Sequence, residues 1–307
     1  MKNLKLKISR KEDENINKKD HKEKDKDKDK DKKKDKKKEN EKGKDKEKGK
    51  GKTTYNIYNY QHNKWLQYEL FSEHPAMLTY LPETLEMSEE NFQYFIDKYG
   101  ECVAKQQIGQ QGIGFYSISK PNRHIESYRV KFLNQTRLFY SAKDVCKFFA
   151  SKKTPYIVQQ KINLVRVNNG ITDIRVILQE LDNNKWVVTG KCVKIAPPKF
   201  VVTYTGQPGR EVKTINCLNR AHGKTIYSTE ELDDLLNLLA YTAIDILKPH
   251  LETHILGLDV GIDTDGRLWL IEAANTHPQL KMFTQLKNKE MYRNILKHKS
   301  KYLNKNR

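Results

Sequence analysis

The stretch GLDVGIDTDGRLWLIEAAN, residues 257–275, indicates the fold more clearly than any other part of the chain. Residues 256–262 alternate apolar with small or polar side chains, and residues 263–266 (DTDG) have the composition of a tight turn. An apolar strand then resumes over residues 267–273. We therefore predict a β-hairpin whose two strands lie side by side.

Two carboxylates and one amide on this hairpin are candidate metal ligands. Asp259 lies on the first strand, Glu272 lies at the end of the second, and Asn275 follows it. Mg²⁺ bound with a nucleotide usually takes one or two carboxylates together with phosphate oxygens, so these side chains indicate a Mg²⁺ site. An ordinary hairpin with solvent-facing acids explains the same spacing, and Asp263 and Asp265 are expected to serve only the turn.

Residues 1–52 are predicted to form a disordered, charged tail. They contain 24 Lys and Arg against 14 Asp and Glu, so they carry +10 of the chain's net charge of +19. Such a segment buries too little apolar surface to offset the entropy lost on ordering. The tail can tether the protein to an anionic surface or polymer, or serve only solubility. Its interleaved acids and its lack of aromatic residues disfavour nucleic-acid binding.

The cysteine and hydropathy patterns exclude several classes of protein. No C-x-x-C pair occurs, so neither a common zinc site nor a small disulfide framework is indicated, and the four cysteines are expected to be reduced. No apolar run approaches about 18 residues, and the N-terminus lacks the apolar core of a signal peptide. We expect a cytoplasmic protein without a membrane span.

Residues 53–307 are expected to fold. Residues 53–100 form a short, aromatic-rich N-terminal segment that ends in a helix from Ser88 to Gly100. A basic helix of about residues 288–303 is predicted within the C-terminal region, residues 286–307. Caps and periodicity predict further elements between them: strands over 126–133 and 137–140, a helix capped by Ser141, a long loop over 197–223 and a long helix capped by Ser228.

A lysine and a glycine-rich turn indicate a phosphate-binding flap. An apolar strand ends at Lys105, a loop contains Gly109, Gly112 and Gly114, and a second strand covers residues 115–118. Glycines let backbone N–H groups approach a phosphate closely, and lysine supplies a compact positive charge. The spacing matches neither a P-loop nor a dinucleotide-binding βαβ unit. A plain glycine hairpin is the alternative.

The sequence YIVQQKI, residues 156–162, reads as a buried strand that becomes polar at Gln159 and Gln160. Backbone groups there could hydrogen-bond a purine edge while Ile157 and Ile162 pack beside it. A sheet edge with exposed glutamines is the alternative.

Two further strands are predicted to form a hairpin: DIRVILQE, residues 173–180, and KWVVTGKCVKIA, residues 185–196. Arg175 shares a strand face with Asp173 and can offer a planar fork to a phosphate, which makes Arg175 the candidate catalytic residue. Asp173 could hold Arg175 or a lysine in place, and a structural ion pair is the alternative. Lys191 and Lys194 are further candidate cations.

Taken in order, LPET, the lysine with its glycine-rich flap, YIVQQKI, DIRV, and GLDVGID followed by LWLIEAAN resemble the ATP-grasp fold, and more narrowly the YheC/YheD group of endospore coat-associated proteins. The resemblance covers roughly residues 60–285. It implies an α+β protein with an ATP-grasp domain over residues 101–285, in which two α+β subdomains grip ATP.

The resemblance also implies ATP and Mg²⁺ as cofactors and assigns roles to residues. Lys105 and the flap would bind phosphates, and Asp259 and Glu272 would bind Mg²⁺. The adenine hinge would be formed by Gln159, Gln160, Lys161 and Ile162.

The sequence departs from the family pattern in two places. The usual metal motif resembles E-x-N, whereas Glu272 is followed by two alanines before Asn275, so Ala274 stands at the expected asparagine. The stretch VVTYTGQPG, residues 201–209, lacks the expected asparagine and glycine pair.

The sequence leads to three alternative hypotheses of function. The first is an ATP- and Mg²⁺-dependent ligase that joins a carboxylate to an amine through an acyl phosphate, associated with the endospore coat. The second is a non-catalytic nucleotide-binding or structural protein of the spore coat, which the Ala274 departure favours. The third, nucleic-acid binding by the tail, has the least support.

Overall fold

The computed structural model describes residue 60 and residues 63–109, 114–122, 124–133, 135–181, 184–198, 200–203, 209–221, 224–274 and 278–305. The chain divides into two units, Met1–Lys52 and Thr53–Arg307. The predicted disordered tail, Gly112 and Asn275 therefore lie outside the described residues, and those three predictions stay predictions.

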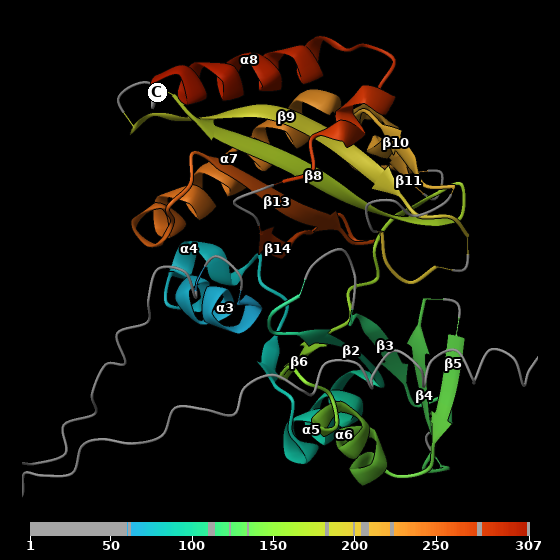
Figure 1. The fold of residues 1–307 in the computed structure, drawn as a ribbon. Helices are drawn as coiled ribbons and strands as arrows, with labels where there is room; N and C mark the ends of the chain where they lie inside the picture. Colours follow the sequence, from blue (N-terminus) through green and yellow to red (C-terminus); the bar gives the residue numbers. More distant parts are fainter. Residues whose placement is uncertain are drawn as a thin grey trace, which may run out of the picture. The chain divides into compact units, whose positions relative to one another are not determined.

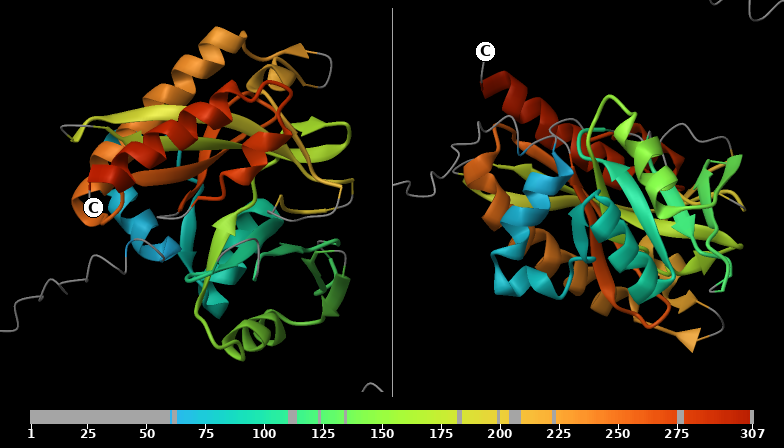
Figure 2. Two further views of the ribbon diagram at one scale, coloured as in Figure 1. Left: turned by 45° about the horizontal axis from the view of Figure 1, so that its top comes forward. Right: turned by 90° about the horizontal axis from the view of Figure 1, so that it is seen from below.

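The first sheet has six antiparallel strands in the order β1-β6-β2-β3-β4-β5 (Figure 1). Its strands are β1 (Thr84–Glu86), β2 (Glu101–Gln106), β3 (Tyr116–Ser119), β4 (Tyr128–Phe132), β5 (Gln135–Phe139) and β6 (Tyr156–Gln160). Two helices, α5 (Glu89–Tyr99) and α6 (Ala142–Ala150), lie side by side on one face of it (Figure 2). The other face carries Lys105, because side chains alternate along β2.

The ends of α5 and α6 follow from their sequences. Ser88 and Ser141 each accept a hydrogen bond from the backbone N–H three residues later, and Gly100 ends α5 in the left-handed conformation with φ of 73°. Phe92, Phe95 and Phe149 then bury their rings against the sheet. These helices confirm the predicted caps.

The second sheet has the strand order β10-β9-β8-β13-β14, with β7 also paired to β8. Its strands are β7 (Arg166–Val167), β8 (Gly170–Glu180), β9 (Trp186–Ile195), β10 (Glu211–Lys213), β13 (Ile255–Ile262) and β14 (Leu268–Ala274). A separate pair consists of β11 (Arg220–Ala221) and β12 (Lys224–Thr225). Both predicted hairpins are confirmed, since β8 pairs with β9 and β13 pairs with β14.

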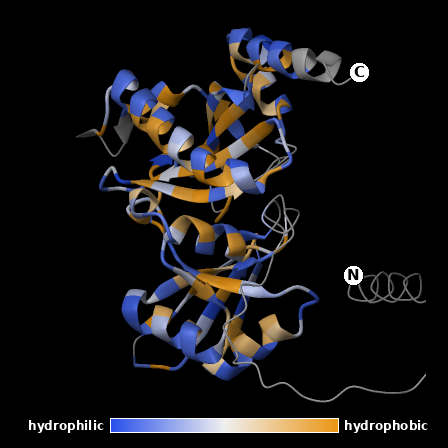
Figure 3. Ribbon diagram, turned by 90° about the vertical axis from the view of Figure 1, so that its left-hand side faces the viewer, coloured by the Kyte–Doolittle hydropathy of each residue, from blue (hydrophilic) through white to orange (hydrophobic). Residues whose placement is uncertain are grey.

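Helices cover both faces of the second sheet. The long helix α7 (Thr229–Leu247) begins with the predicted capping box of Ser228 and Glu231 and packs on the face that carries Val176. The terminal helix α8 (Glu290–Lys305), mostly hydrophilic in Figure 3, places Ile295 against Ile177 on the opposite face. Because Arg175 lies two residues before Ile177, its side chain shares the α8 face rather than the α7 face.

The N-terminal segment is more regular than predicted. It contains the helix α3 (Lys64–Ser72), capped by Asn63, and the short helix α4 (Pro75–Leu78). Phe71 and Met77 join the core of the second sheet. The sequence showed that this segment is rich in aromatic residues, but it did not show against which sheet they pack.

The predicted loop over residues 197–223 is wrong as a description of the whole region. Besides β10, it contains the 3₁₀ helix η2 (Ile215–Leu218), whose Ile215 and Leu218 are buried in the core. The strand β10 pairs with the edge of β9 through only three residues. So short a strand, in a segment rich in proline and glycine, gives no recognisable pattern in the sequence. Two further 3₁₀ helices are η3 (Lys248–His250) and η4 (Lys281–Gln285). Within the described residues, no helix is long and apolar enough to cross a membrane.

Candidate functional site

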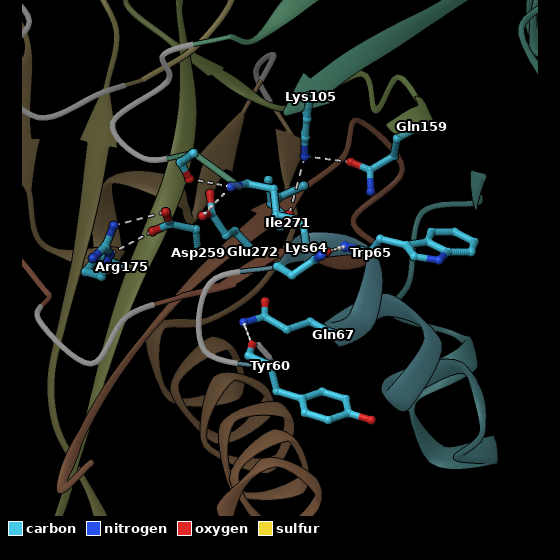
Figure 4. Close-up of polar contacts among 12 residues, drawn as sticks. Tyr60, Lys64, Trp65, Gln67, Lys105, Gln159, Arg175, Asp259, Ile271 and Glu272 are labelled. Carbon is cyan, nitrogen blue, oxygen red and sulfur yellow. Dashed lines mark hydrogen bonds and ion pairs between the residues drawn. The ribbon is translucent and has the colours of Figure 1, made fainter. Parts of the chain in front are cut away.

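A buried lysine on the first sheet faces the end of the second. Lys105, only 8% exposed, donates from Nζ to Gln159 Oε1 at 2.6 Å and to the carbonyl oxygen of Ile271 at 3.4 Å (Figure 4). Gln159 in turn donates to Thr84 Oγ1 at 2.8 Å. The sequence did not predict this contact between Lys105 and Gln159, and no carboxylate among the described residues lies within 4.0 Å of Lys105 Nζ.

The strand β6 is an interior strand, which excludes one of the two interpretations of its glutamines and leaves the adenine hinge a prediction. It lies between β1 and β2, so the alternative of an exposed sheet edge is wrong. Gln159 is 7% exposed, and Ile157 lies beside Lys105 in the β2–β6 register. On the other side, the backbone N–H of Gln160 donates to the carbonyl oxygen of Glu83, and the side-chain Oε1 of Gln160 accepts from the backbone N–H of Glu83.

The two candidate metal-binding carboxylates lie opposite each other on the hairpin. Asp259 on β13 pairs in register with Glu272 on β14, and a bulge follows between Asp259 and Val260. Directly opposite residues of antiparallel strands place their side chains on one face of the sheet. The hairpin therefore brings together the two acids that the sequence placed thirteen residues apart.

Cations already neutralise Asp259. Arg175 forms two hydrogen bonds to it, from Nε at 2.7 Å and from a terminal nitrogen at 3.0 Å, and Lys194 Nζ lies 2.9 Å from the same carboxylate. Lys194 also pairs with Asp173 at 2.6 Å, and Thr203 donates a hydrogen bond to Asp173. Asp173 therefore holds a lysine, and the partner of Arg175 is Asp259.

The two further candidate cations on β9 separate. Lys194 lies opposite Asp173 and faces the site, whereas Lys191 pairs at 2.6 Å with Asp233 of α7. An odd spacing of three residues puts the two lysines on opposite faces of the strand. Lys191 is therefore not part of the candidate site.

A cation that the sequence analysis missed completes the cluster. Lys64, the first residue of α3, lies 3.3 Å from Glu272 Oε1 and donates to the carbonyl oxygen of Gly109 at 2.6 Å (Figure 4). Asn63 could have been recognised as a helix cap ahead of an apolar periodic stretch. No local signal shows that this helix begins beside Glu272, more than 200 residues away in the sequence.

Burial and charge shift the pKa values of the site in different directions. Burial lowers the pKa of Lys105 to about 8, against the opposing negative charge of Glu272. Burial raises the pKa of Asp173 to about 7, in spite of its pairing with Lys194. Burial also disfavours the charge of Asp259, but Arg175 and Lys194 overcome that effect and hold its pKa at about 2. Asp259 is therefore ionised throughout the physiological range.

The other residues predicted for the flap and the adenine hinge lie farther from Lys105 and its cavity. Gly109 contacts Lys64 through its carbonyl, and Gly114 has φ of 75° with Gln106 packed so closely that a Cβ would lie 2.4 Å from its side chain. Lys161 pairs with Glu101 at 2.5 Å, and Ile162 follows β6 as a partly buried residue. Neither is among the residues that line the cavity beside Lys105.

That cavity is small. Lys64, Lys105, Gln159 and Glu272 line it together with apolar residues of α3 and β14, and its volume is about 40 Å³. This is room for about one water molecule. A nucleotide at this position would require the elements around it to separate.

A family model described as YheC/D like ATP-grasp matches residues 54–305. The chain is 27% identical over 232 residues to the endospore coat-associated protein YheD of Bacillus subtilis, covering 72% of this chain and 49% of that protein. It is 23% identical over 215 residues to the endospore coat-associated protein YheC of the same organism, covering 68% of this chain and 58% of that protein. The chain thus spans about half the length of the curated relatives that it matches.

Solved structures with a similar fold include two synthetases and a ligase. They are the D-cycloserine synthetase DcsG (TM-score 0.49, 13% identity, 77% of this chain and 69% of that chain), D-alanyl-alanine synthetase A from Vibrio cholerae (0.47, 14%, 79% and 61%) and the ATP-grasp ligase PsnB complexed with a minimal precursor (0.47, 14%, 80% and 62%).

Proposed function

The chain belongs to the YheC/D-like ATP-grasp family, and on that premise we propose that it binds ATP with Mg²⁺ and joins a carboxylate to an amine. The observation that carries the proposal is Lys105, a buried cation without a carboxylate partner among the described residues. A buried, unpaired ammonium group is costly, and an anionic ligand would offset that cost. The triphosphate of ATP, a substrate of the proposed reaction, is such an anion.

Lys105 and Lys64 are proposed to hold the phosphates. Each contacts a hydrogen-bond acceptor that a phosphate oxygen could replace: Gln159 Oε1 for Lys105 and the Gly109 carbonyl for Lys64. Movement of Lys64 away from Gly109 would release the beginning of the glycine-rich flap. The flap can then place backbone N–H groups against the phosphates and exclude water.

Asp259 and Glu272 are the proposed Mg²⁺ ligands, with Asn275 outside the described residues as a third. Their oxygens suit this hard cation, and two carboxylates are enough when phosphate oxygens complete the coordination. Both carboxylates face cations, so Mg²⁺ would compete with Lys64 at Glu272 and with Arg175 and Lys194 at Asp259. When bound, Mg²⁺ would neutralise the charge on the phosphates.

The proposed reaction has two steps. An acceptor carboxylate attacks the terminal phosphoryl group of ATP and gives an acyl phosphate and ADP, and an amine then displaces phosphate to form an amide. Arg175 is proposed to stabilise the charge on the transferred phosphoryl group. Its two hydrogen bonds to Asp259 fix the plane of the guanidinium before substrate arrives.

Two measurements test this function. ATP with Mg²⁺ should raise the melting temperature, because a ligand that binds only the folded state stabilises it by mass action. Release of inorganic phosphate should then require a carboxylate and an amine together, supplied from a panel of amino acids and peptides. No melting shift at millimolar ATP would contradict nucleotide binding; a shift without phosphate release across the panel would contradict the ligase reaction.

A second function, a nucleotide-binding or structural protein without turnover, is favoured by a specific observation. Asp259 and Glu272 are both neutralised by protein cations, and Ala274 stands where the family motif has asparagine. A site whose acids are so well paired binds Mg²⁺ less readily. This protein would show the ATP melting shift with little dependence on Mg²⁺.

The names of both curated relatives suggest a place for the protein. YheD and YheC are named endospore coat-associated proteins. We propose that this chain is made in the cytoplasm and is deposited with spore coat components, which would be its partners. Fractionation of sporulating cells with an antibody to the chain tests this, and a signal confined to the cytoplasm would contradict it.

A further inference from the structure

Positive charge is concentrated in a short part of the folded unit, away from the candidate site. Residues 53–307 carry 34 Lys and Arg against 25 Asp and Glu, a net charge of +9. Residues 128–153, which span β4, β5 and α6, carry seven Lys and Arg against one Asp, a net charge of +6. The basic residues are Arg129, Lys131, Arg137, Lys143, Lys147, Lys152 and Lys153. Two thirds of the net charge therefore lies within a tenth of the unit.

Four of these lysines line one groove. The groove has a volume of about 590 Å³ and runs between α6 with the turn that follows it and the segment from β1 to the start of α5. Lys143, Lys147, Lys152 and Lys153 form one side of it. A groove of this size is typical of ligand sites.

The lysines of the groove are weakly neutralised. Lys143 and Lys153 have no carboxylate within 4.0 Å in the described part of the chain, and Lys147 has only Asp144, at 3.9 Å on the exposed helix surface. Lys152 lies 4.1 Å above the ring of Phe148, which fixes its position without cancelling its charge. Arg137 stacks on the same ring at 5.3 Å, so positive charge continues from the groove onto β5.

The remaining lining mixes apolar and polar side chains, and two acids stand on the facing wall, where Gln107 donates to Glu86 Oε1 at 2.9 Å. Met87, Cys146 and Phe149 contribute the apolar part, and Glu86 and Glu89 stand opposite the lysines. The lining thus offers positive charge on one side, hydrogen-bond acceptors on the other and apolar surface between them.

The groove is separate from the candidate nucleotide site. Phe149 and Tyr156, which line it, belong to the core between α5, α6 and the first sheet. Lys105 projects from the other face of that sheet, toward β14. A ligand in the groove would therefore not occupy the place proposed for ATP.

We propose that this groove, which we call the α6 groove, binds an acidic peptide segment of a partner protein. Aspartate or glutamate side chains of the peptide would pair with the four lysines. Apolar side chains between them would rest on Met87 and Cys146, and Glu86 or Glu89 would accept backbone N–H groups. Charge complementarity of this kind gives speed and specificity of association more than affinity.

Two observations favour a peptide over a nucleic acid. A continuous phosphate backbone would be repelled by Glu86 and Glu89, whereas a peptide can place N–H groups there. The two aromatic residues among the described lining, Phe149 and Tyr156, are 3% and 4% exposed, so they offer no ring face on which a base could stack.

The test measures binding of a fluorescein-labelled octaglutamate peptide to the full chain by fluorescence anisotropy at low salt. The groove variant is K143Q/K147Q/K153Q, and the matched control is K185Q/K281Q/K287Q, which removes the same charge from exposed positions outside the groove. An eight-nucleotide thymidine strand serves as a nucleic-acid probe of similar charge. The groove variant should raise the Kd for octaglutamate at least about fivefold and the control less than about twofold.

Equal losses in the two triple variants would overturn the proposal, because the peptide would then respond only to net charge. A larger groove-dependent loss for the thymidine strand than for octaglutamate would overturn it in favour of nucleic acid. The melting temperatures of all proteins are compared first. If the groove variant melts early, K143Q/K153Q replaces it and leaves Lys147 and Asp144 in place; the same comparison with a double control, K185Q/K287Q, then decides.

Discussion

The charged residues of the candidate site nearly balance one another without a ligand. Four cations, Lys64, Lys105, Arg175 and Lys194, meet three carboxylates, Asp173, Asp259 and Glu272. Lys105 is the cation without a carboxylate partner among the described residues, because its two hydrogen bonds are to an amide oxygen and a carbonyl oxygen. The site is therefore short of one negative charge, and binding of a phosphate would correct this.

The first prediction asks whether Glu272 binds a metal. In E272Q the side chain keeps its size but loses its charge, so the melting shift caused by ATP should lose its Mg²⁺-dependent part. D265N is the matched control, since Asp265 is an exposed acid of the same hairpin and its side chain forms no hydrogen bond or ion pair with the described residues. The measurement is thermal unfolding of the three proteins with ATP, with and without Mg²⁺. A full Mg²⁺ response in E272Q would show that the acid pairs only with Lys64.

The second prediction uses the lowered pKa of Lys105, about 8 in the folded protein. The unfolded chain, with a lysine pKa of about 10.4, binds more protons between these values, so wild-type stability should gain up to roughly 3 kcal/mol as pH rises through that window. The variant K105M has no ionisable group at this position, so it should not show this gain in the free energy of unfolding. Urea unfolding at about pH 7.5 and 9.5 should therefore show the stability of K105M relative to wild type falling with pH. A difference that stays constant would mean that Lys105 is not desolvated.

At this scale the sequence predicted the identity of most site residues but not their partners. Lys105, Gln159, Arg175, Asp173, Asp259 and Glu272 could be chosen from strand ends and residue chemistry. The pairing of Arg175 with Asp259 depends on β13 lying beside β8, a register between strands more than 80 residues apart. Lys64 was missed for the same reason, because its contact with Glu272 exists only in the folded chain.

Among the elements, the hairpin of β13 and β14 depends on one turn residue. Asp263 was predicted to serve the turn, and it accepts hydrogen bonds from the backbone N–H groups of Asp265 and Arg267 and from the indole N–H of Trp269, at 2.9–3.0 Å and 2.8 Å. One carboxylate thus closes the turn and fixes the second strand. The register that starts at this turn continues to the pair Val260–Leu270, and the bulge beyond it then places Asp259 opposite Glu272.

The third prediction follows from this turn. D263A leaves three donors without their acceptor and should lower the free energy of unfolding by about 2 kcal/mol, whereas D265A, two residues away, should change it by less than about 0.5 kcal/mol. Urea unfolding measures both. Equal effects of the two substitutions would contradict the role given to Asp263 and would point to a general effect of turn charge.

Elements with strong local signals were predicted well, and those held by tertiary contacts were not. The helices capped by Ser88, Ser141 and Ser228 and the two long hairpins follow from local chemistry. The failure at residues 197–223 has a physical cause, since β10 and η2 are ordered by an adjacent strand edge and by core contacts rather than by their own propensity.

For the whole molecule, the main division lies between the charged tail and the rest of the chain. The chain divides between Lys52 and Thr53, and the family match begins at residue 54, one residue into the second unit. Both positions lie within two residues of the change in composition at residue 52, and the division into tail and folded part stays a prediction. The charge of the two units is similar, +10 and +9, although the first is about a fifth as long.

The last prediction is that removal of residues 1–52 leaves stability unchanged. A segment with few apolar residues has little with which to pack, so the truncated protein should melt within about 1 °C of the full chain at physiological salt. The melting shift caused by ATP and Mg²⁺ should also be the same, since every site residue described lies beyond residue 60. Repeating both melts at low salt serves as the control for long-range charge effects, because screening by salt weakens these and leaves packing intact. A large loss of stability that persists at high salt would show that the tail docks on the folded unit.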